Sequence, residues 1–282
     1  MPRKQSINES LIIRYITYLR EQERSEATIR KYTHDLWEFC MYLQGNPLTK
    51  TALIDWKQML ISRFAPSTVN SMLAVINGYL RFMGWQKICV KLLRIQRSLF
   101  LDEKKELTRE EYVRLVRVAQ SQENERLSLV IQTICATGIR VSELQFITAE
   151  AVYCGKAEIN NKGKVRIVFL PEKLRRLLKG YLRKQKKTAG AVFTTRTGKP
   201  LDRSNIWRDM KALCECAGVS PEKVFPHNLR HLFARTFYTV ERDLSRLADI
   251  LGHSSLTTTR IYTAESGLIH ACQMGRLGLI IT

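Results

Sequence analysis

Apolar residues recur at intervals of three and four positions through residues 1–86, which is the spacing of helices with one buried face. The pattern predicts helices that begin near Ser10, Ser25, Thr51 and Pro66. Serine caps first-turn amides and proline is tolerated in a first turn, which supports these starts. Because this stretch shows no strand-like alternation, we expect a compact helical bundle.

The periodicity weakens over residues 87–105, where lysines and arginines separate short apolar groups, and we interpret this stretch as a linker. A new helix is expected at Thr108, because Glu111 three residues later completes the spacing of a capping box. A strongly apolar helix is predicted over residues 127–137, and Gly138 ends it.

Strand-like segments follow that helix. Residues 156–159 and 165–170 flank a turn that contains Gly163, which predicts a β-hairpin, and residues 191–193 predict a further short strand. Helical periodicity then returns, and the expected helix boundaries are Pro171, Asp202 or Ser204, Pro226, Gly252 and Ser255. The pattern as a whole predicts a mainly α protein with a small antiparallel β-sheet.

The same pattern suggests how the chain is divided. We expect a helical domain over residues 1–86, the linker over 87–105, a second domain of mixed α/β structure over 106–265, and a C-terminal segment over 266–282. The C-terminal segment is too apolar for a free tail. Packing on its own domain is one way to bury this segment.

The charge balance points to a class of partner. The chain carries 46 Lys and Arg against 26 Asp and Glu, a formal net charge of +20 with a pI near 9.9. The basic excess lies in both halves, which excludes a basic tail on an otherwise neutral enzyme. Such an excess favours a polyanion, because neutralised phosphates release condensed counterions. A generally basic surface is the alternative explanation of the charge alone.

Composition also bears on cofactors and location. The seven cysteines are scattered and include no Cys-x-x-Cys pair, so we expect reduced thiols in a cytoplasmic protein rather than zinc ligands. The sequence shows no signal peptide and no apolar run approaching the roughly 18 residues of a membrane span. It also shows neither a phosphate-binding Gly-rich loop nor a carboxylate metal cluster, and we expect a reaction without metal or cofactor.

Four residues stand at positions suited to chemistry on a phosphate. His227 and Arg230 share a helix face, so that an imidazole could move a proton beside a guanidinium that binds phosphate oxygens. Arg140 follows the glycine that ends an apolar helix, and Glu143 lies three residues on, where it could pair with Arg140. The alternatives are that His227 and Arg230 have only a structural role and that Arg140 is an exposed surface arginine.

Three more candidates follow from local context. Lys162 lies at the tip of the expected hairpin, where loop residues often act on ligands. His253 follows a glycine that ends a helix, and a short helix then leads to Tyr262. A phenol with a pKa near 10 must lose its proton to act as a nucleophile. The alternatives are that His253 only packs in the fold, that Lys162 is an ordinary solvated turn residue, and that Tyr262 is a core aromatic.

Taken in order, these residues resemble the tyrosine recombinases, a family that includes phage- and mobile-element-type integrases and the Xer recombinases. The resemblance covers about residues 101–270 and rests on Thr137-Gly138-Ile139-Arg140-Val141-Ser142-Glu143-Leu144, the hairpin lysine, His227-x-x-Arg230, Leu251-Gly252-His253-Ser254-Ser255 and Thr258-Thr259-Arg260-Ile261-Tyr262. It implies a SAM-like core-binding domain over residues 1–86 and a catalytic domain over 106–265, which together form a C-shaped clamp on DNA.

The resemblance also implies roles for single residues. Arg140 and Arg230 hold the scissile phosphate, Lys162 protonates the leaving 5′ oxygen, His227 acts in acid–base catalysis, His253 supports the phosphate, Tyr262 is the nucleophile and Glu143 supports the site. Lys164 lies two residues from Lys162, and counting back from Arg166 favours Lys162 as the catalytic lysine.

Further DNA contacts are expected from polar and basic residues of the N-terminal helices, the linker and the hairpin, namely Arg30, Lys31, His34, Ser67, Thr68, Asn70, Arg94, Arg97 and Lys164. Short polar side chains near helix N-termini suit phosphate contact. An ordinary solvated face is the alternative for each of them.

We therefore interpret the chain as a site-specific recombinase that cleaves and rejoins DNA through a 3′-phosphotyrosine, as the integrase of a bacterial mobile element would at the nucleoid. The resemblance implies double-stranded DNA with inverted-repeat core sites, a synaptic homotetramer joined through the C-terminal segment, and room for an accessory directionality factor. A Xer-like resolvase of chromosome or plasmid dimers is one alternative, because no extra N-terminal arm-binding domain is recognisable. A catalytically silent DNA-binding regulator is another, against which the complete residue set argues.

Overall fold

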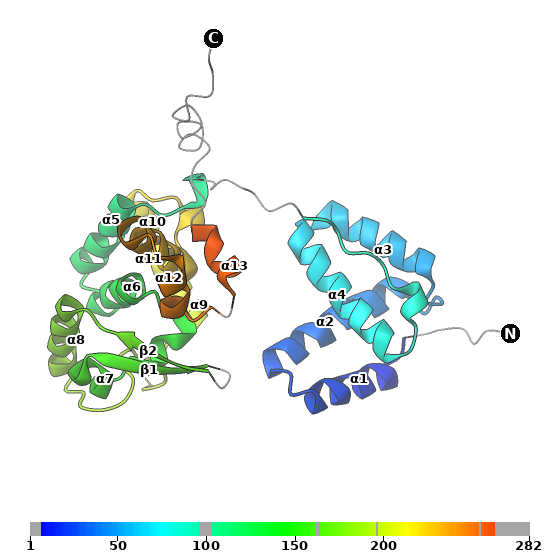
Figure 1. Cartoon of the computed structure of the whole chain (residues 1–282), viewed down its shortest axis with the longest axis horizontal. Coiled ribbons are helices and arrows are strands. Elements are labelled where there is room, and N and C mark those ends of the chain that lie inside the picture. Colours follow the sequence, from blue (N-terminus) through cyan, green and yellow to red (C-terminus); the bar gives the residue numbers. More distant parts are fainter. Residues whose placement is uncertain (1–6, 96–102, 162–163, 196, 254, 263–282) are drawn as a thin grey trace, which may run out of the picture. The chain divides into compact units, whose positions relative to one another are not determined.

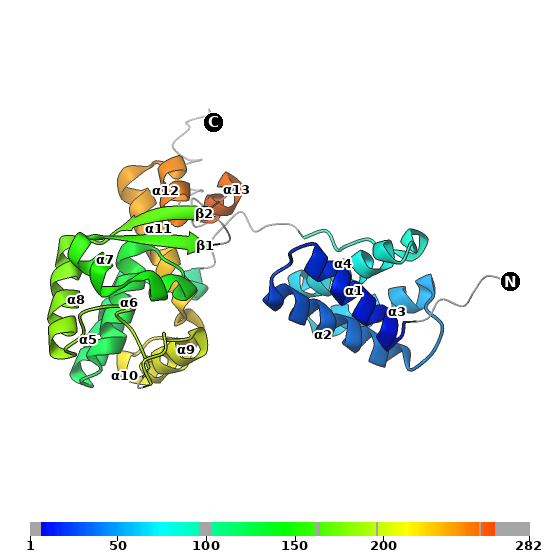
Figure 2. The same cartoon turned by 90° about the horizontal axis from the view of Figure 1, so that it is seen from below.

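The computed structural model describes residues 7–95, 103–161, 164–195, 197–253 and 255–262. Two compact units make up the chain, with the division between Arg97 and Ser98. We call them the N-terminal unit and the C-terminal unit and describe each by itself (Figures 1 and 2).

Helices build the N-terminal unit. Its described elements are α1 (Glu9–Glu21), α2 (Glu26–Leu43), α3 (Lys50–Arg63), α4 (Pro66–Phe82) and the short 3₁₀ helix η1 (Gln86–Ile88). Ser25 caps α2, as expected. The expected cap at Ser10 is wrong, because Asn8 accepts the bond from the Leu11 amide and the Ser10 hydroxyl instead donates to Asn8.

The core of this unit is closed by aromatic contacts. Phe39 of α2 and Trp56 of α3 lie with ring centroids 4.6 Å apart, and both side chains are buried. Tyr79 of α4 packs edge-on against Tyr15 of α1 at 5.5 Å. Large buried aromatic side chains each bury much apolar area, so these contacts help to hold the helices together alongside the aliphatic side chains of the core.

The segment after η1 is tied to α4 by two asparagine side chains. The amide group of Asn77 exchanges two hydrogen bonds with the backbone of Val90, and that of Asn70 does the same with Leu93. Seven helical residues rise about 10.5 Å, which matches three extended residues at about 3.4 Å each. The spacing of the two asparagines therefore fits an extended strap along the helix.

The C-terminal unit is also mostly helical. Its described elements are η2 (Glu103–Lys105), α5 (Arg109–Ser121), α6 (Glu125–Thr137), η3 (Val141–Phe146), α7 (Ala149–Cys154), β1 (Lys156–Asn161), β2 (Lys164–Phe169), α8 (Glu172–Lys184), α9 (Arg203–Ala212), α10 (Cys214–Ala217), η4 (Pro221–Lys223), α11 (Pro226–Glu241), α12 (Leu244–Leu251), α13 (Leu256–Thr259) and η5 (Arg260–Tyr262). The predicted mainly α fold with a small antiparallel sheet is confirmed.

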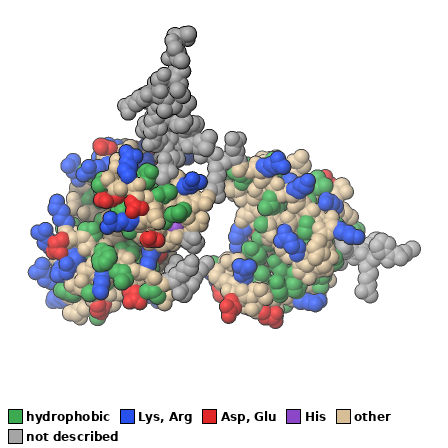
Figure 3. Space-filling view, in the orientation of Figure 1, with side chains coloured by type: hydrophobic (Ala, Val, Ile, Leu, Met, Phe, Trp, Pro, Cys, Tyr) green, Lys and Arg blue, Asp and Glu red, His purple; other side chains and the backbone are tan. Residues whose placement is uncertain are grey.

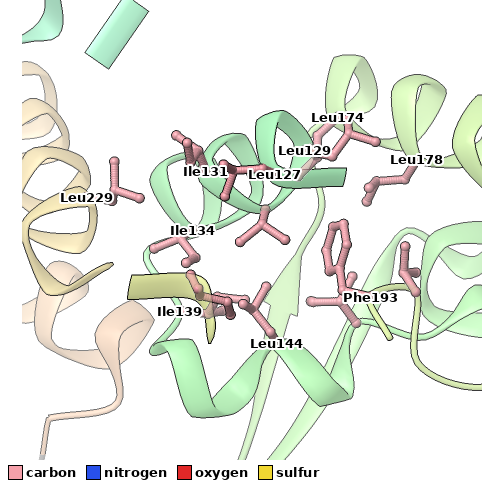
Figure 4. Packing of buried hydrophobic residues seen from close by; sticks show 14 of the residues in the cluster. Leu127, Leu129, Ile131, Ile134, Ile139, Leu144, Leu174, Leu178, Phe193 and Leu229 are labelled. Carbon is pink, nitrogen blue, oxygen red and sulfur yellow. The ribbon is translucent and has the colours of Figure 1, made fainter. Parts of the chain in front are cut away.

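Helix α6 lies at the centre of this unit and contacts α5, α8, α9 and α11 (Figures 1 and 2). Figure 4 shows its apolar side chains facing α8 on one side and Leu229 of α11 on the other. Ile131 and Ile134 are fully buried there. The predicted capping box at Thr108 is present at the start of α5. The helices that pack on α6 are therefore held in place around it. The C-terminus of α6 leads directly into the candidate site.

The hairpin is longer than the sequence pattern predicts. The antiparallel ladder runs from the Lys156–Phe169 pair to the Asn161–Lys164 pair, so two residues lie between the strands instead of five. Residues 191–193 do not form the expected strand. Ala191 makes only an isolated bridge to Thr148, because Val192 and Phe193 turn into the core.

Basic side chains lie on the surfaces of both units (Figure 3). In the C-terminal unit many of them belong to α8, whose sequence EKLRRLLKGYLRK places apolar residues on one face and lysines and arginines on the other. Among the described residues, no helix is both long and apolar enough to cross a membrane.

Candidate active site

Arg230 is the centre of the candidate site. Its side chain projects from α11 and is 1% exposed, and its Nη atoms donate to the Gly138 carbonyl at 2.5 Å and to the Leu251 carbonyl at 2.7 Å. Burial and then the nearby Arg140 lower the pKa of Arg230 to about 10, which leaves it charged at neutral pH. Within the described residues its guanidinium donates to carbonyls, to an imidazole and to the Tyr262 hydroxyl, which are all uncharged, so its charge stays available to an anionic ligand.

Gly138 allows this arrangement because it has no side chain. It ends α6 with φ of +65°, and a Cβ there would lie 2.4 Å from the Phe233 ring. The left-handed conformation turns the chain so that the Gly138 carbonyl faces Arg230. The predicted helix end is therefore also a part of the site.

Arg140 is held by Glu143, as the sequence spacing suggested. The Glu143 carboxylate is 1% exposed and accepts from the Arg140 amide at 2.8 Å and from its Nη1 at 3.0 Å. A second arginine, Arg166 of β2, donates to both carboxylate oxygens at 3.3 and 2.8 Å. One buried carboxylate thus fixes two arginines and joins η3 to the hairpin.

His253 lies on the far side of Arg230. Gly252 ends α12 with φ of +65°, and the His253 ring then accepts a bond from Arg230 through Nε2 and contacts the Thr259 hydroxyl through Nδ1, both at 2.9 Å. Because an arginine can only donate, Nε2 carries no proton and Nδ1 donates to Thr259. Burial and the adjacent Arg230 lower the pKa of His253 to about 4, so the ring is neutral.

Tyr262 packs against the same group. Its side chain is 5% exposed, and its ring is stacked on that of His253 with a centroid distance of 6.1 Å. Burial raises the pKa of the Tyr262 hydroxyl, while the positive charge of Arg230 and a hydrogen bond from it act in the opposite direction. The short η5 turn therefore brings the phenol to the buried arginine.

His227 faces an open cleft of about 410 Å³ that Arg140 and Arg230 also line. Its side chain is exposed, unlike that of His253. Partial burial, and then electrostatic interaction with His231 and Arg230, lower the pKa of His227 to about 4. The cleft thus presents two guanidiniums and a neutral imidazole, which suit a ligand that carries negative charge on several oxygens.

The structure shows less about the other predicted residues. Lys162 and Arg97 lie outside the described residues, as does the C-terminal segment 266–282. For Lys164 the structure gives a backbone position in the hairpin ladder. Of the DNA contacts predicted in the N-terminal unit, Arg30, Lys31, His34, Ser67, Thr68 and Arg94 are exposed. Lys31 pairs with the buried Asp35, and Asn70 is engaged by the backbone strap.

Several residues around the site were missed by reasoning from the sequence. Arg203 and Trp207 of α9 line the cleft, and Arg166 shares Glu143 with Arg140. His231 lies one turn along α11 from His227, and its ring packs edge-on against Tyr262. Only His231 had a sequence signal, because its spacing of four places it on the helix face of His227.

Comparison with protein-family models agrees with this geometry. Residues 105–267 match the phage integrase family, and residues 12–87 match its N-terminal SAM-like domain. Tyrosine recombinase XerA of Pyrococcus furiosus is 29% identical over 271 residues, which is 93% of this chain and 91% of the relative.

Solved structures show the same fold. The XerH site-specific recombinase bound to its difH substrate has a TM-score of 0.71 at 22% identity, covering 95% of this chain and 85% of that one. A lambda integrase dimer bound to a COC′ core site has a TM-score of 0.74 at 17% identity, covering 90% and 94%. The resemblance inferred from the motifs is confirmed, and the chain belongs to the phage integrase family of tyrosine recombinases, enzymes that cleave and rejoin DNA.

Proposed function

We propose that this protein is a site-specific DNA recombinase in which Tyr262 attacks a phosphodiester held by Arg140 and Arg230. The observation that carries the proposal is the convergence of the buried Arg230, His253 and Tyr262 beside a cleft that Arg140 and His227 line. These side chains come from four separate parts of the C-terminal unit, so their convergence does not follow from local structure.

The two arginines supply the charge that the reaction needs. Attack on a phosphodiester adds negative charge to the two non-bridging oxygens as five ligands gather around phosphorus. Preorganised guanidiniums stabilise that charge without having to reorganise during the reaction. Arg230 is fixed by two carbonyls and Arg140 by Glu143, so both side chains are preorganised in this sense.

The bonds balance without an external energy source. The Tyr262 oxygen forms a bond to phosphorus as the bond to the 5′ oxygen breaks, and the product is a 3′-phosphotyrosine with a free 5′ hydroxyl. A second 5′ hydroxyl can then reverse the reaction on another strand. We assign protonation of the leaving oxygen to Lys162, and a role in proton transfer at the phosphate to His227.

The proposal is tested with a nicked suicide duplex that carries the cognate core site, from which the cleaved end diffuses away. Wild-type protein should form a covalent protein–DNA adduct that survives denaturation in SDS. Tyr262→Phe should still bind the duplex but form no adduct. An adduct in Tyr262→Phe would show that another residue is the nucleophile.

The assignment of the leaving-group acid has its own test. Lys162→Ala should slow cleavage by about 10² to 10⁴, the usual range for loss of a general acid, while the matched control Lys164→Ala should cleave at nearly the wild-type rate. A 5′-bridging phosphorothioate leaves as a thiolate without protonation and should restore cleavage by Lys162→Ala. Failure to restore it would contradict the acid role.

The biological role can be framed in two ways. An integrase of a bacterial mobile element is the first, as the motif resemblance suggested. A Xer-like resolvase of chromosome or plasmid dimers is the second, and the relation to XerA over nearly the whole of both chains supports it equally well. Flanking DNA separates the two, because an integrase gene lies beside an attachment site bounded by the ends of its element.

We further propose that two inverted half-sites each bind one subunit and that two such complexes form a homotetramer. Support comes from the lambda integrase structure, which is a dimer on a core site. The C-terminal segment would link the subunits. A chain that ends after residue 265 should then bind a half-site but fail to assemble paired sites in native gels, whereas normal pairing would argue for packing on its own domain.

A further inference from the structure

A second histidine of α11 contacts the nucleophile. The rings of His231 and Tyr262 lie 5.1 Å apart, centroid to centroid, at an interplanar angle of 85°. The His231 side chain is 20% exposed, yet its Nε2 atom is buried and has no hydrogen-bond partner among the described residues. A buried polar atom without a partner is uncommon in folded proteins and is therefore a candidate for a function.

The Glu106 carboxylate lies beside the Nδ1 atom of His231. Its Oε1 lies 3.5 Å from His231 Nδ1, and its Oε2 lies 3.6 Å from Arg235 Nη1. An ionised carboxylate can only accept, so it favours the tautomer with hydrogen on Nδ1. The neutral ring then has a lone pair on Nε2, which is the buried atom without a partner.

The reaction needs such a group. Tyr262 must lose its hydroxyl proton as it attacks, and burial raises the pKa of that hydroxyl. His253 cannot accept the proton, because its Nε2 already accepts from Arg230 and its Nδ1 donates to Thr259. His227 faces the open cleft with the arginines. Among the described residues its ring packs against His231, and no ring contact joins it to Tyr262.

We propose that His231 is the base that accepts the hydroxyl proton of Tyr262, with Glu106 orienting its ring. This inference rests on the proposed function of Tyr262. The proton moves from the phenol oxygen to His231 Nε2, the phenol oxygen bonds to phosphorus, and the 5′ oxygen leaves with a proton from the separate leaving-group acid. The imidazolium formed on His231 is stabilised by the Glu106 carboxylate, as in other carboxylate–histidine–nucleophile arrangements.

The first test measures single-turnover cleavage of the suicide duplex. His231→Ala should lower the cleavage rate by about 10² to 10⁴ while leaving duplex binding unchanged, because loss of a general base typically costs this much. Added imidazole should restore part of the rate. Glu106→Gln keeps an acceptor near Nδ1 but loses the charge, and it should lower the rate less than His231→Ala does.

The second test separates proton transfer from packing. A fluorinated tyrosine at position 262 has a more acidic phenol, so the rate should depend much less on His231. The ratio of wild-type to His231→Gln rates should therefore shrink with fluorotyrosine, and the acid limb of the pH–rate profile should change in His231→Gln. The groups that contact His231 are Glu106 before α5, Tyr262 in η5 and His227 on α11. Arg235, one turn further along α11, pairs with the same Glu106 carboxylate.

The outcomes are distinct. A wild-type protein that forms no Tyr262 adduct would overturn the proposed function itself. Normal adduct formation with an unchanged rate in His231→Gln, or a loss that neither imidazole nor fluorotyrosine reduces, would show that His231 only packs against the nucleophile. If His231→Ala does not fold, the His231→Gln and fluorotyrosine comparison decides between the two.

Discussion

Glu143 gives the most direct test of how the site is held together. Glu143→Gln keeps the size of the side chain but removes its charge and presents an NH₂ group to arginine donors. In the wild-type protein, Glu143 is 1% exposed and accepts four hydrogen bonds from Arg140 and Arg166. Breaking a buried ion pair by removing one partner costs about 3–5 kcal/mol, because an uncompensated charge stays buried.

The loss of stability in Glu143→Gln comes mainly from Arg166, because Arg166 is the more buried of the two arginines. Its side chain is 15% exposed, and burial lowers the pKa of Arg166 while Glu143 raises it. We therefore expect Glu143→Gln to lower the free energy of unfolding of the C-terminal unit by about 3 kcal/mol or more. The double variant with Arg166→Met should lose less than the two single variants together, because the buried charge is then also removed.

The assay must report on the correct unit. Three of the four tryptophans, Trp37, Trp56 and Trp85, lie in the N-terminal unit, so tryptophan fluorescence would follow mainly that unit. Calorimetry or hydrogen exchange of the C-terminal unit is suitable instead. A loss below about 1 kcal/mol in Glu143→Gln, or strict additivity in the double variant, would refute the view that this carboxylate holds the two arginines.

Two further predictions concern the glycine and the histidine that adjoin Arg230. Gly138→Ala should destabilise the C-terminal unit by about 2–4 kcal/mol, from left-handed backbone strain and contact with Phe233, and a calorimetric loss below 1 kcal/mol would contradict it. Because His253 has a folded pKa of about 4 against 6.5 when unfolded, the unfolded chain binds the proton first as pH falls. Stability should therefore fall by about 1–2 kcal/mol between pH 7 and pH 5, and urea unfolding of His253→Gln should show a smaller fall; an equal fall would exclude this source.

Local signals in the sequence predicted most element boundaries. The Thr108–Glu111 capping box and the Ser25 cap are present, and Gly138 and Gly252 both adopt the left-handed conformation that ends a helix. These features depend on a few neighbouring residues, so a pattern can reveal them. Asn8 was missed because asparagine and serine cap equally well, and Ser10 lies only two residues away.

Tertiary context explains the errors. Residues 191–193 have the composition of a strand, but Val192 and Phe193 are buried in the helical core and the chain there pairs only at Ala191. The hairpin is longer than predicted because Asn160 and Asn161 pair with β2, although asparagine is typical of turns.

The candidate site shows the same limit. The residues that carry recognisable motifs, such as Arg230 and His253, lie together as expected. Arg166, Trp207 and Glu106 have no motif, since each reaches the site from an element distant in sequence. Sequence spacing reveals partners within one turn of a helix, whereas contacts across the fold need coordinates.

The covalent bond between Tyr262 and DNA can be identified chemically. Protein trapped on the suicide duplex is digested with protease and nuclease, and the modified peptide is sequenced by mass spectrometry. We predict a nucleotide attached through its 3′ phosphate to Tyr262, together with a free 5′ hydroxyl on the released strand that polynucleotide kinase can label. A phosphate attached to another residue, or a linkage through the 5′ end, would contradict it.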